Sequence, residues 1–152
     1  MSEADLGKSA EELKKVGLDL TQVIQDTHTE TMMKLASILG GSLEYAIKTK
    51  MLRNKEVVDE KQFKPFGKLA NLDKRIDKAH ELGLLDDVAK KDAHLVRKIR
   101  NDFAHEGEKR HFDSDEIVAL AKDLSTYAAA TTNQEAILTA SSKVMGQLKS
   151  KR

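Results

Sequence analysis

The stretch TETMMKLASILGGSLEYAIKTKML, residues 29–52, decides the fold class of this chain. Its apolar side chains recur every three or four residues and cover most of the circumference of a helix. A helix with so wide an apolar surface is buried by its neighbours, so this segment predicts the central helix of a bundle. Gly40 and Gly41, in its middle, each cost about 1 kcal/mol relative to alanine, and we expect close approach of a neighbouring helix to compensate.

The composition of the whole chain supports a helical fold. One proline, eight glycines and an aromatic content of 4% favour helices over sheets. Strand-like alternation of apolar and polar residues is absent over any useful length. We therefore predict an all-α bundle of about six helices in a single domain, residues 1–152. Within it we expect a peripheral N-terminal helix over 1–26, a core over 29–131 and a C-terminal helix over 133–152.

Capping signals set the boundaries of the shorter helices. We expect a polar connection over 53–66 with one turn of helix near 56–63, and then helices over 66–82, 86–105, 113–131 and from 133. Gly83 is a natural C-terminal stop, and an aspartate at 86 or 87 caps the next helix. The run Asp113-Ser114-Asp115-Glu116 has the pattern of a capping box, and Asn133 is the expected cap of the last helix.

Charge and cysteine content limit the functional classes. The chain has 26 basic and 25 acidic residues, so its net charge is +1, which argues against a long DNA footprint but not against a small RNA site. It has no cysteine and no apolar run near the roughly 20 residues that cross a bilayer, and its acidic N-terminus does not resemble a secretion signal. We expect a cytoplasmic protein without membrane contact. His28, His80 and His111 lack a metal-ligand spacing, and we expect neither metal nor cofactor.

One segment, residues 94–105, concentrates chemically useful side chains. On a helical wheel its apolar residues cluster within about 100° of arc, as expected for a core-facing surface. The opposite surface carries the candidate site residues, which are His94, Arg97, Arg100, Asn101 and His105. On an ideal helix Arg100 and His105 point about 140° apart, so they converge only if the arginine stem bends or a second copy of the helix contributes.

These residue types suit phosphate chemistry. Histidine transfers protons near neutral pH, and arginine stabilises charge that develops on phosphate oxygens. RNA supplies its own nucleophile, the 2′-hydroxyl, so such a site needs no metal. Two other interpretations stay open. The surface is an ordinary solvated helix face, or it is a homodimer interface in which Arg97 and Arg100 pair with acidic residues of the other subunit.

The order of several motifs resembles the mannitol operon repressor (MltR) family. The motifs run over roughly two-thirds of the chain, residues 29–124, and are Pro65-Phe66-Gly67-Lys68-Leu69, Arg75-Ile76, His80-Glu81-Leu82-Gly83-Leu84-Leu85 and the segment from Leu95 to His105. This resemblance implies a dimeric regulatory protein that influences transcription through another regulatory protein. No short helix–turn–helix with a basic recognition helix is evident, so we do not expect direct DNA binding.

The run Arg100-Asn101-Asp102-Phe103-Ala104-His105 is also similar to the Arg-x4-His signature of the HEPN superfamily. Many members are dimeric helical bundles that cleave RNA without a metal, and others only bind or regulate. The resemblance implies that Arg100 stabilises the scissile phosphate, Asn101 orients it and His105 is the acid and base. Apart from this resemblance, we predict His94, Arg97 and Arg100 as the binding residues of this surface. The regulator explains more of the chain, whereas the nuclease explains why these residues occur together.

Overall fold

Helices are the regular elements of the part of the chain that the computed structural model describes, residues 20–106 and 110–152. In chain order they are α2 (Leu20–Arg53), the 3-10 helix η1 (Glu60–Phe63), α3 (Leu72–Glu81), α4 (Asp87–Glu106), α5 (Asp115–Ala121) and α6 (Asn133–Lys151). The fold is an all-α bundle, as the sequence predicts. None of these helices is long and apolar enough to span a membrane.

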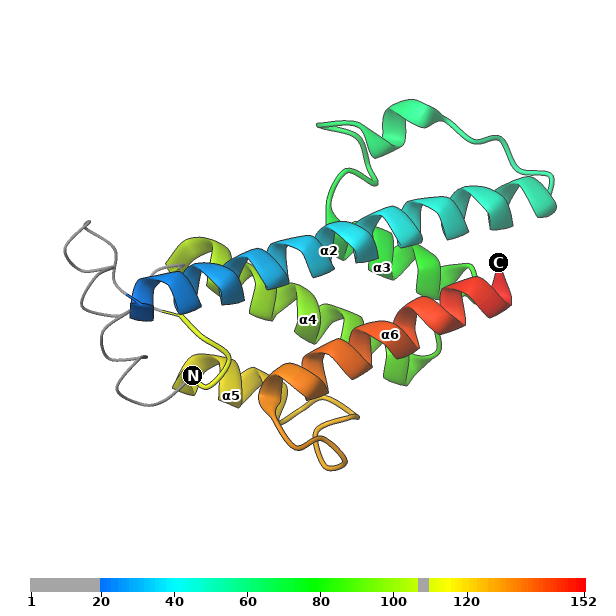
Figure 1. Cartoon of the computed structure of the whole chain (residues 1–152). Coiled ribbons are helices and arrows are strands. Elements are labelled where there is room, and N and C mark those ends of the chain that lie inside the picture. The colour runs from blue at the N-terminus through cyan, green and yellow to red at the C-terminus, as the bar shows by residue number, and fades with distance from the viewer. Residues whose placement is uncertain (1–19, 107–109) are drawn as a thin grey trace, which may run out of the picture.

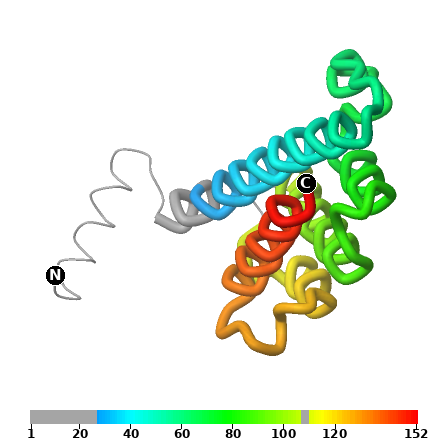
Figure 2. Tube along the Cα trace, turned by 90° about the vertical axis from the view of Figure 1, so that its right-hand side faces the viewer, coloured from blue at the N-terminus to red at the C-terminus, as the bar shows by residue number. Residues whose placement is uncertain are grey.

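Three long helices, α2, α4 and α6, form the centre of the bundle (Figure 1). The helix α4 runs antiparallel to α2 and α6, and Figure 2 shows α2 above α6 with α3 and α4 to one side. Their facing side chains make one apolar core, because each helix buries one stripe of its surface. The largest fully buried side chains include Met32, Leu39, Leu43, Ile47, Ile76, Ile99, Phe103, Ile117 and Ile137.

The central helix is longer than the sequence predicts. We expected one helix to end at residue 26 and another to start at 29, but α2 continues through this point, so the predicted break is wrong. The ring of His28 lies 4.8 Å from that of Phe112, and its Nδ1 accepts a hydrogen bond from the Phe112 amide. Burial lowers the pKa of His28, which keeps Nδ1 available as an acceptor. Tertiary contact thus holds the helix where local sequence suggested a boundary. Residues 1–19 of the expected N-terminal helix lie outside the described residues.

The predicted role of the paired glycines is also wrong. A Cβ built on Gly40 would meet Arg75 and Leu72 only at ordinary contact distances of 3.7 and 3.9 Å, and one on Gly41 would meet nothing within 4 Å. No neighbouring helix therefore depends on their small size. Both glycines instead line a cavity, and their missing side chains leave it open.

The helix α3 begins at Leu72 and not at residue 66. Residues 64–70 form successive turns instead, in which Gly67 N donates to Lys64 O and Ala70 N donates to Gly67 O. Phe66 has a φ of 70°, which is incompatible with a right-handed helix. The single turn expected near 56–63 is present as η1, and Gly83, at φ 75°, ends the α3 region as predicted.

The helix α5 is much shorter than predicted, because it ends at Ala121 and not near Thr131. Asp92 of α4, which is 3% exposed, accepts hydrogen bonds from both the amide and the hydroxyl of Ser125. The bonds to Asp92 fix Ser125 in a position outside the helix, so the chain does not continue α5 to Thr131. Two expected caps also differ. Ser114 Oγ accepts from the His111 amide and not from α5, and Thr132, not Asn133, caps α6 by accepting from the Glu135 amide.

Candidate functional site

A cavity of about 640 Å³ lies between α2, α3 and α4. We call it the arginine groove, because three arginines from two helices reach it. Small side chains of α2 form one wall, the start of α3 forms a second, and the polar surface of α4 forms the third. The lining residues are Met33, Ala36, Ser37, Gly40, Gly41, Ala70, Asn71, Leu72, Asp73, Arg75, Arg97, Arg100 and Asn101.

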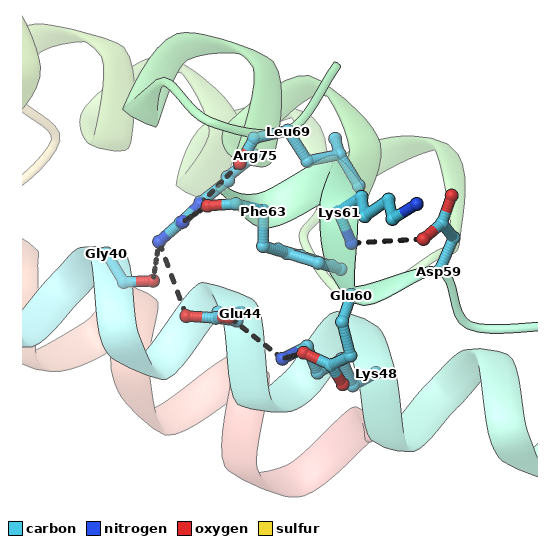
Figure 3. A network of polar contacts seen from close by, with 9 residues as sticks. All are labelled: Gly40, Glu44, Lys48, Asp59, Glu60, Lys61, Phe63, Leu69 and Arg75. Carbon is cyan, nitrogen blue, oxygen red and sulfur yellow. Dashed lines mark hydrogen bonds and ion pairs between the residues drawn. The ribbon is translucent and has the colours of Figure 1, made fainter. Parts of the chain in front are cut away.

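Arg75 of α3 is fully engaged by the fold. Its guanidinium donates to the carbonyl oxygens of Leu69, Gly40 and Phe63 at 2.8, 3.0 and 3.2 Å (Figure 3). It also lies 3.8 Å from a carboxylate oxygen of Glu44. These bonds join α3, α2 and the connection between them, so Arg75 is a structural clamp at the edge of the arginine groove.

Arg97 and Arg100 of α4 have fewer hydrogen-bond partners than Arg75. Arg100 Nη1 donates to Asn101 Oδ1 at 3.1 Å, and Arg97 Nε donates to His94 Nδ1 at 3.3 Å. Neither guanidinium forms an ion pair with any residue in the described ranges, and both side chains are half-buried. Two cations thus face the same cavity with most of their N–H donors unused. A site of this composition attracts an anion that can accept several hydrogen bonds.

His94 supports Arg97 from outside the arginine groove. Because its Nδ1 accepts from Arg97, its Nε2 carries the proton and donates to Asp77 Oδ1 at 2.8 Å. This bond from His94 is the main reason that the pKa of Asp77 lies below its ordinary value. His94 lines a second depression, between α4 and the chain near Asp123. His94 therefore contacts Arg97 but does not line the arginine groove.

His105 does not line the arginine groove. Its side chain is exposed and makes no hydrogen bond or ion pair with the described part of the chain. Of the predicted site residues, the fold therefore gathers Arg97, Arg100 and Asn101 at one cavity, whereas His105 lies on the last turn of α4, outside the lining of that cavity. A joint action of Arg100 and His105 stays a prediction. It requires either a movement of these side chains within one chain or the His105 of a second copy.

An acidic neighbour of this site is neutralised by the fold. Asp102 follows Asn101 directly, but its carboxylate lies 2.5 Å from Arg110 Nε, and Arg110 also lies 3.5 Å from Glu116. The hydrogen bond to Asp102 raises the pKa of Arg110. Asp102 is consequently paired with Arg110 and does not pair with Arg100. Among residues 20–106 and 110–152, no three histidine or acidic side chains gather in a way that would hold a metal ion.

Sequence reasoning missed the contribution of α3 to the site. Arg75 was noted only as part of a resemblance, and Asn71 and Asp73 were not noted. The position of Arg75 beside the buried Ile76 is a signal that its side chain lies at the edge of the core. Its partners are backbone carbonyls of two other segments, however, and no pattern in side-chain types marks those.

Comparison with known proteins adds no further evidence: no protein-family model, curated protein or solved structure matches this chain. The MltR and HEPN resemblances therefore rest on the motifs quoted above.

Proposed function

We propose that this chain is an MltR-like regulatory protein that binds RNA by holding a phosphate group in the arginine groove. One observation carries the proposal: Arg97 and Arg100 line a concave site without a carboxylate partner in the described residues. Guanidinium groups bind phosphate oxygens in bidentate geometry, and their strength rises where water is partly excluded.

The alternative ligand for this site is a carboxylate on a protein partner. The MltR resemblance implies such a protein partner. Several features of the groove favour phosphate. The two guanidiniums of Arg97 and Arg100 and the amides of Asn71 and Asn101 line one cavity, whose single carboxylate among the described residues is that of Asp73, and a phosphate offers more acceptor oxygens to such donors than a carboxylate does. The balanced charge of the chain fits a short strand and not a long duplex.

The test is RNA affinity measured by fluorescence anisotropy over a series of salt concentrations. The Arg97→Ala/Arg100→Ala variant removes both candidate phosphate ligands. The Lys91→Ala/Lys98→Ala variant removes the same charge from exposed positions of the same helix, outside the arginine groove. We expect the arginine variant to lose at least about tenfold in affinity and to bind with a salt slope smaller by about two. Equal losses in both variants would show non-specific attraction and refute the proposal.

Metal-independent RNA cleavage is the second candidate function. The observation in its favour is that His105 is exposed on the helix that presents Arg100 and Asn101, and that it bonds to no side chain in the described part of the chain. In this reaction His105 takes the proton of the 2′-hydroxyl, and the oxygen attacks phosphorus while Arg100 stabilises the charge. The bond to the 5′-oxygen breaks, which leaves a 2′,3′-cyclic phosphate, and the departing 5′-oxygen takes a proton from water while His105 later returns its proton to solvent. Because His105 does not line the arginine groove of its own chain, the proposed chemistry places it in a dimer, where a second copy contributes.

Incubation of mixed RNA with the protein in EDTA tests cleavage. We expect activity that is abolished by Arg100→Ala and by His105→Ala, whereas the His105→Ala variant still binds RNA. Binding without cleavage in the wild-type protein would restrict the function to recognition. If the wild-type protein binds no RNA, pull-down of a protein partner through Arg97 and Arg100 becomes the next test.

A further inference from the structure

The connection between α2 and α3 contains a second feature suited to RNA. We call residues 59–71 the hook, because the chain leaves α2, turns through η1 and returns to the start of α3 (Figure 1). Asp59 caps η1 by accepting from the Lys61 amide, and Leu69 N donates to Gln62 O at 2.7 Å. These bonds close the hook on itself.

The hook is also fixed firmly to the bundle. The ring of Phe63 is buried in the core, with Lys48 Nζ 4.7 Å above its centre. Lys48 pairs with Glu60 at 2.5 Å, and Arg75 binds the carbonyls of Phe63 and Leu69 (Figure 3). The hook is therefore held in one conformation before any partner arrives, which lowers the entropy that binding costs.

Phe66 is the fully exposed aromatic residue of the hook. Its φ of 70° lies in the left-handed region that a bulky residue rarely adopts. The next residue must be glycine, because a Cβ on Gly67 would lie 2.3 Å from the Gln62 carbonyl oxygen. The fold thus maintains backbone strain in order to place an aromatic ring in solvent, and such strain concentrates at functional sites.

The charges around Phe66 favour a polyanion. Lys61, Lys64 and Lys68 form no ion pair with the described residues. Of the two acidic residues of the hook, Glu60 is paired with Lys48, and Asp59 accepts a hydrogen bond from the Lys61 amide. An aromatic ring among unpaired lysines is the composition of single-strand nucleic-acid sites, where bases stack on the ring and cations contact the phosphates.

The hook is also close to the arginine groove. Ala70, four residues after Phe66, lines that groove, so the Cα of Phe66 lies within about 14 Å of its wall. At about 3.4 Å or more per nucleotide, a strand of four nucleotides covers this distance. One short strand can therefore place a phosphate in the arginine groove and a base at Phe66.

We propose that Phe66 is a stacking platform for an unpaired RNA base, whose strand is anchored by a phosphate in the arginine groove. This inference rests on the proposed function and adds a ligand preference. We expect the protein to bind single-stranded RNA more tightly than duplex RNA, because a base stacked within a duplex offers no free face. Purines, which have larger faces, stack more strongly than pyrimidines.

A fluorescence experiment detects the stacking directly. The chain contains no tryptophan, so Phe66→Trp introduces a single reporter into the hook. The matched control is Val57→Trp, which places the same reporter at another exposed position of the connection, 88% exposed in the native chain. The probes are oligoadenylate of about ten nucleotides with 2′-O-methyl groups, which prevent cleavage, and an abasic strand of the same length. We expect oligoadenylate to quench the reporter at 66 but not the one at 57, and the abasic strand to quench neither.

Affinity measurements separate this inference from the function on which it rests. We expect Phe66→Ala to weaken oligoadenylate binding about 5- to 100-fold and Phe66→Tyr to preserve it, with little change for a duplex of the same length. If Phe66→Ala binds normally while Arg97→Ala/Arg100→Ala does not, the stacking proposal is refuted and the proposed function stands. If the wild-type protein binds neither strand nor duplex, both are refuted.

Discussion

Arg75 and the pair Arg97 and Arg100 line the same cavity, yet the fold treats them oppositely. Arg75 gives its donors to three backbone carbonyls and lies near Glu44. Among the described residues, Arg97 and Arg100 each donate to one side chain of their own helix, three residues or one residue away. The first arrangement uses the charge to join segments that are distant in sequence, whereas the second leaves it available to a ligand. Residue type alone therefore does not identify the functional arginines.

The largest expected effect is on the stability of the Arg75→Ala variant. The carbonyls of Gly40, Phe63 and Leu69 would each lose a donor in a half-buried place, so we expect the free energy of unfolding to fall by about 2–4 kcal/mol. Urea denaturation measures this. The matched controls, Arg97→Ala and Arg100→Ala, should change stability by no more than about 0.5 kcal/mol. Similar losses in all three variants would remove the distinction drawn above.

The second prediction concerns the hook that Arg75 clamps. The Gly67→Ala substitution forces a methyl group against the carbonyl oxygens of Gln62 and Lys61, at 2.3 and 2.4 Å, and the neighbouring backbone must move. We expect a loss of about 1–3 kcal/mol in unfolding free energy. Hydrogen exchange should show faster exchange at the Leu69 amide, which bonds across the hook. Unchanged exchange there would mean that the hook is not built around this glycine.

The third prediction is a gain in stability, at Gly41 in the α2 wall of the arginine groove. Gly41 lies within α2 with open space where a Cβ would stand, so Gly41→Ala should raise the free energy of unfolding by about 1 kcal/mol. Thermal denaturation reports this as a higher Tm. A lower Tm would indicate that the position requires glycine for packing, as the sequence alone suggested.

The smallest expected effect concerns Asp77, which bonds to the His94 ring that accepts from Arg97. The hydrogen bond from His94 lowers the pKa of Asp77, so the folded state favours its charged form. The stabilisation is present above the ordinary pKa of 3.8 and is lost as pH falls through the lower folded value. Asp77→Asn should therefore lower the free energy of unfolding slightly at neutral pH, where the wild-type bond is charged, and flatten the pH dependence of stability below about pH 4. An unchanged acid limb in the variant would show that this bond does not stabilise the fold.

The sequence predicted most of the helices, because their apolar spacing is set by contact with one core. Leu95, Val96, Ile99 and Phe103 are all buried on the predicted side of α4. The errors occur where a side chain from elsewhere determines the backbone. His28 meets Phe112 and keeps α2 continuous, and Asp92 binds Ser125 and ends α5 early. Such contacts join segments tens of residues apart, and local patterns do not contain them.

The candidate site was predictable to a similar extent. Arg97, Arg100 and Asn101 were found because one helix carries them, and helical periodicity places them on one surface. The wall that contains Asn71 and Arg75 depends on how α3 packs against α2. The wheel placed Arg100 and His105 far apart in angle, and His105 indeed lies outside the cavity that Arg100 lines.

The central claim is that Arg97 and Arg100, but not Arg75, are available to a phosphate. NMR of the arginine side-chain Nε–Hε groups tests it most directly, during titration with oligoadenylate carrying 2′-O-methyl groups. We predict that the resonances of Arg97 and Arg100 shift progressively and reach saturation, whereas that of Arg75, whose Nε donates to the Leu69 carbonyl, stays in place. Binding of the oligonucleotide without a shift at Arg97 and Arg100 would contradict the account.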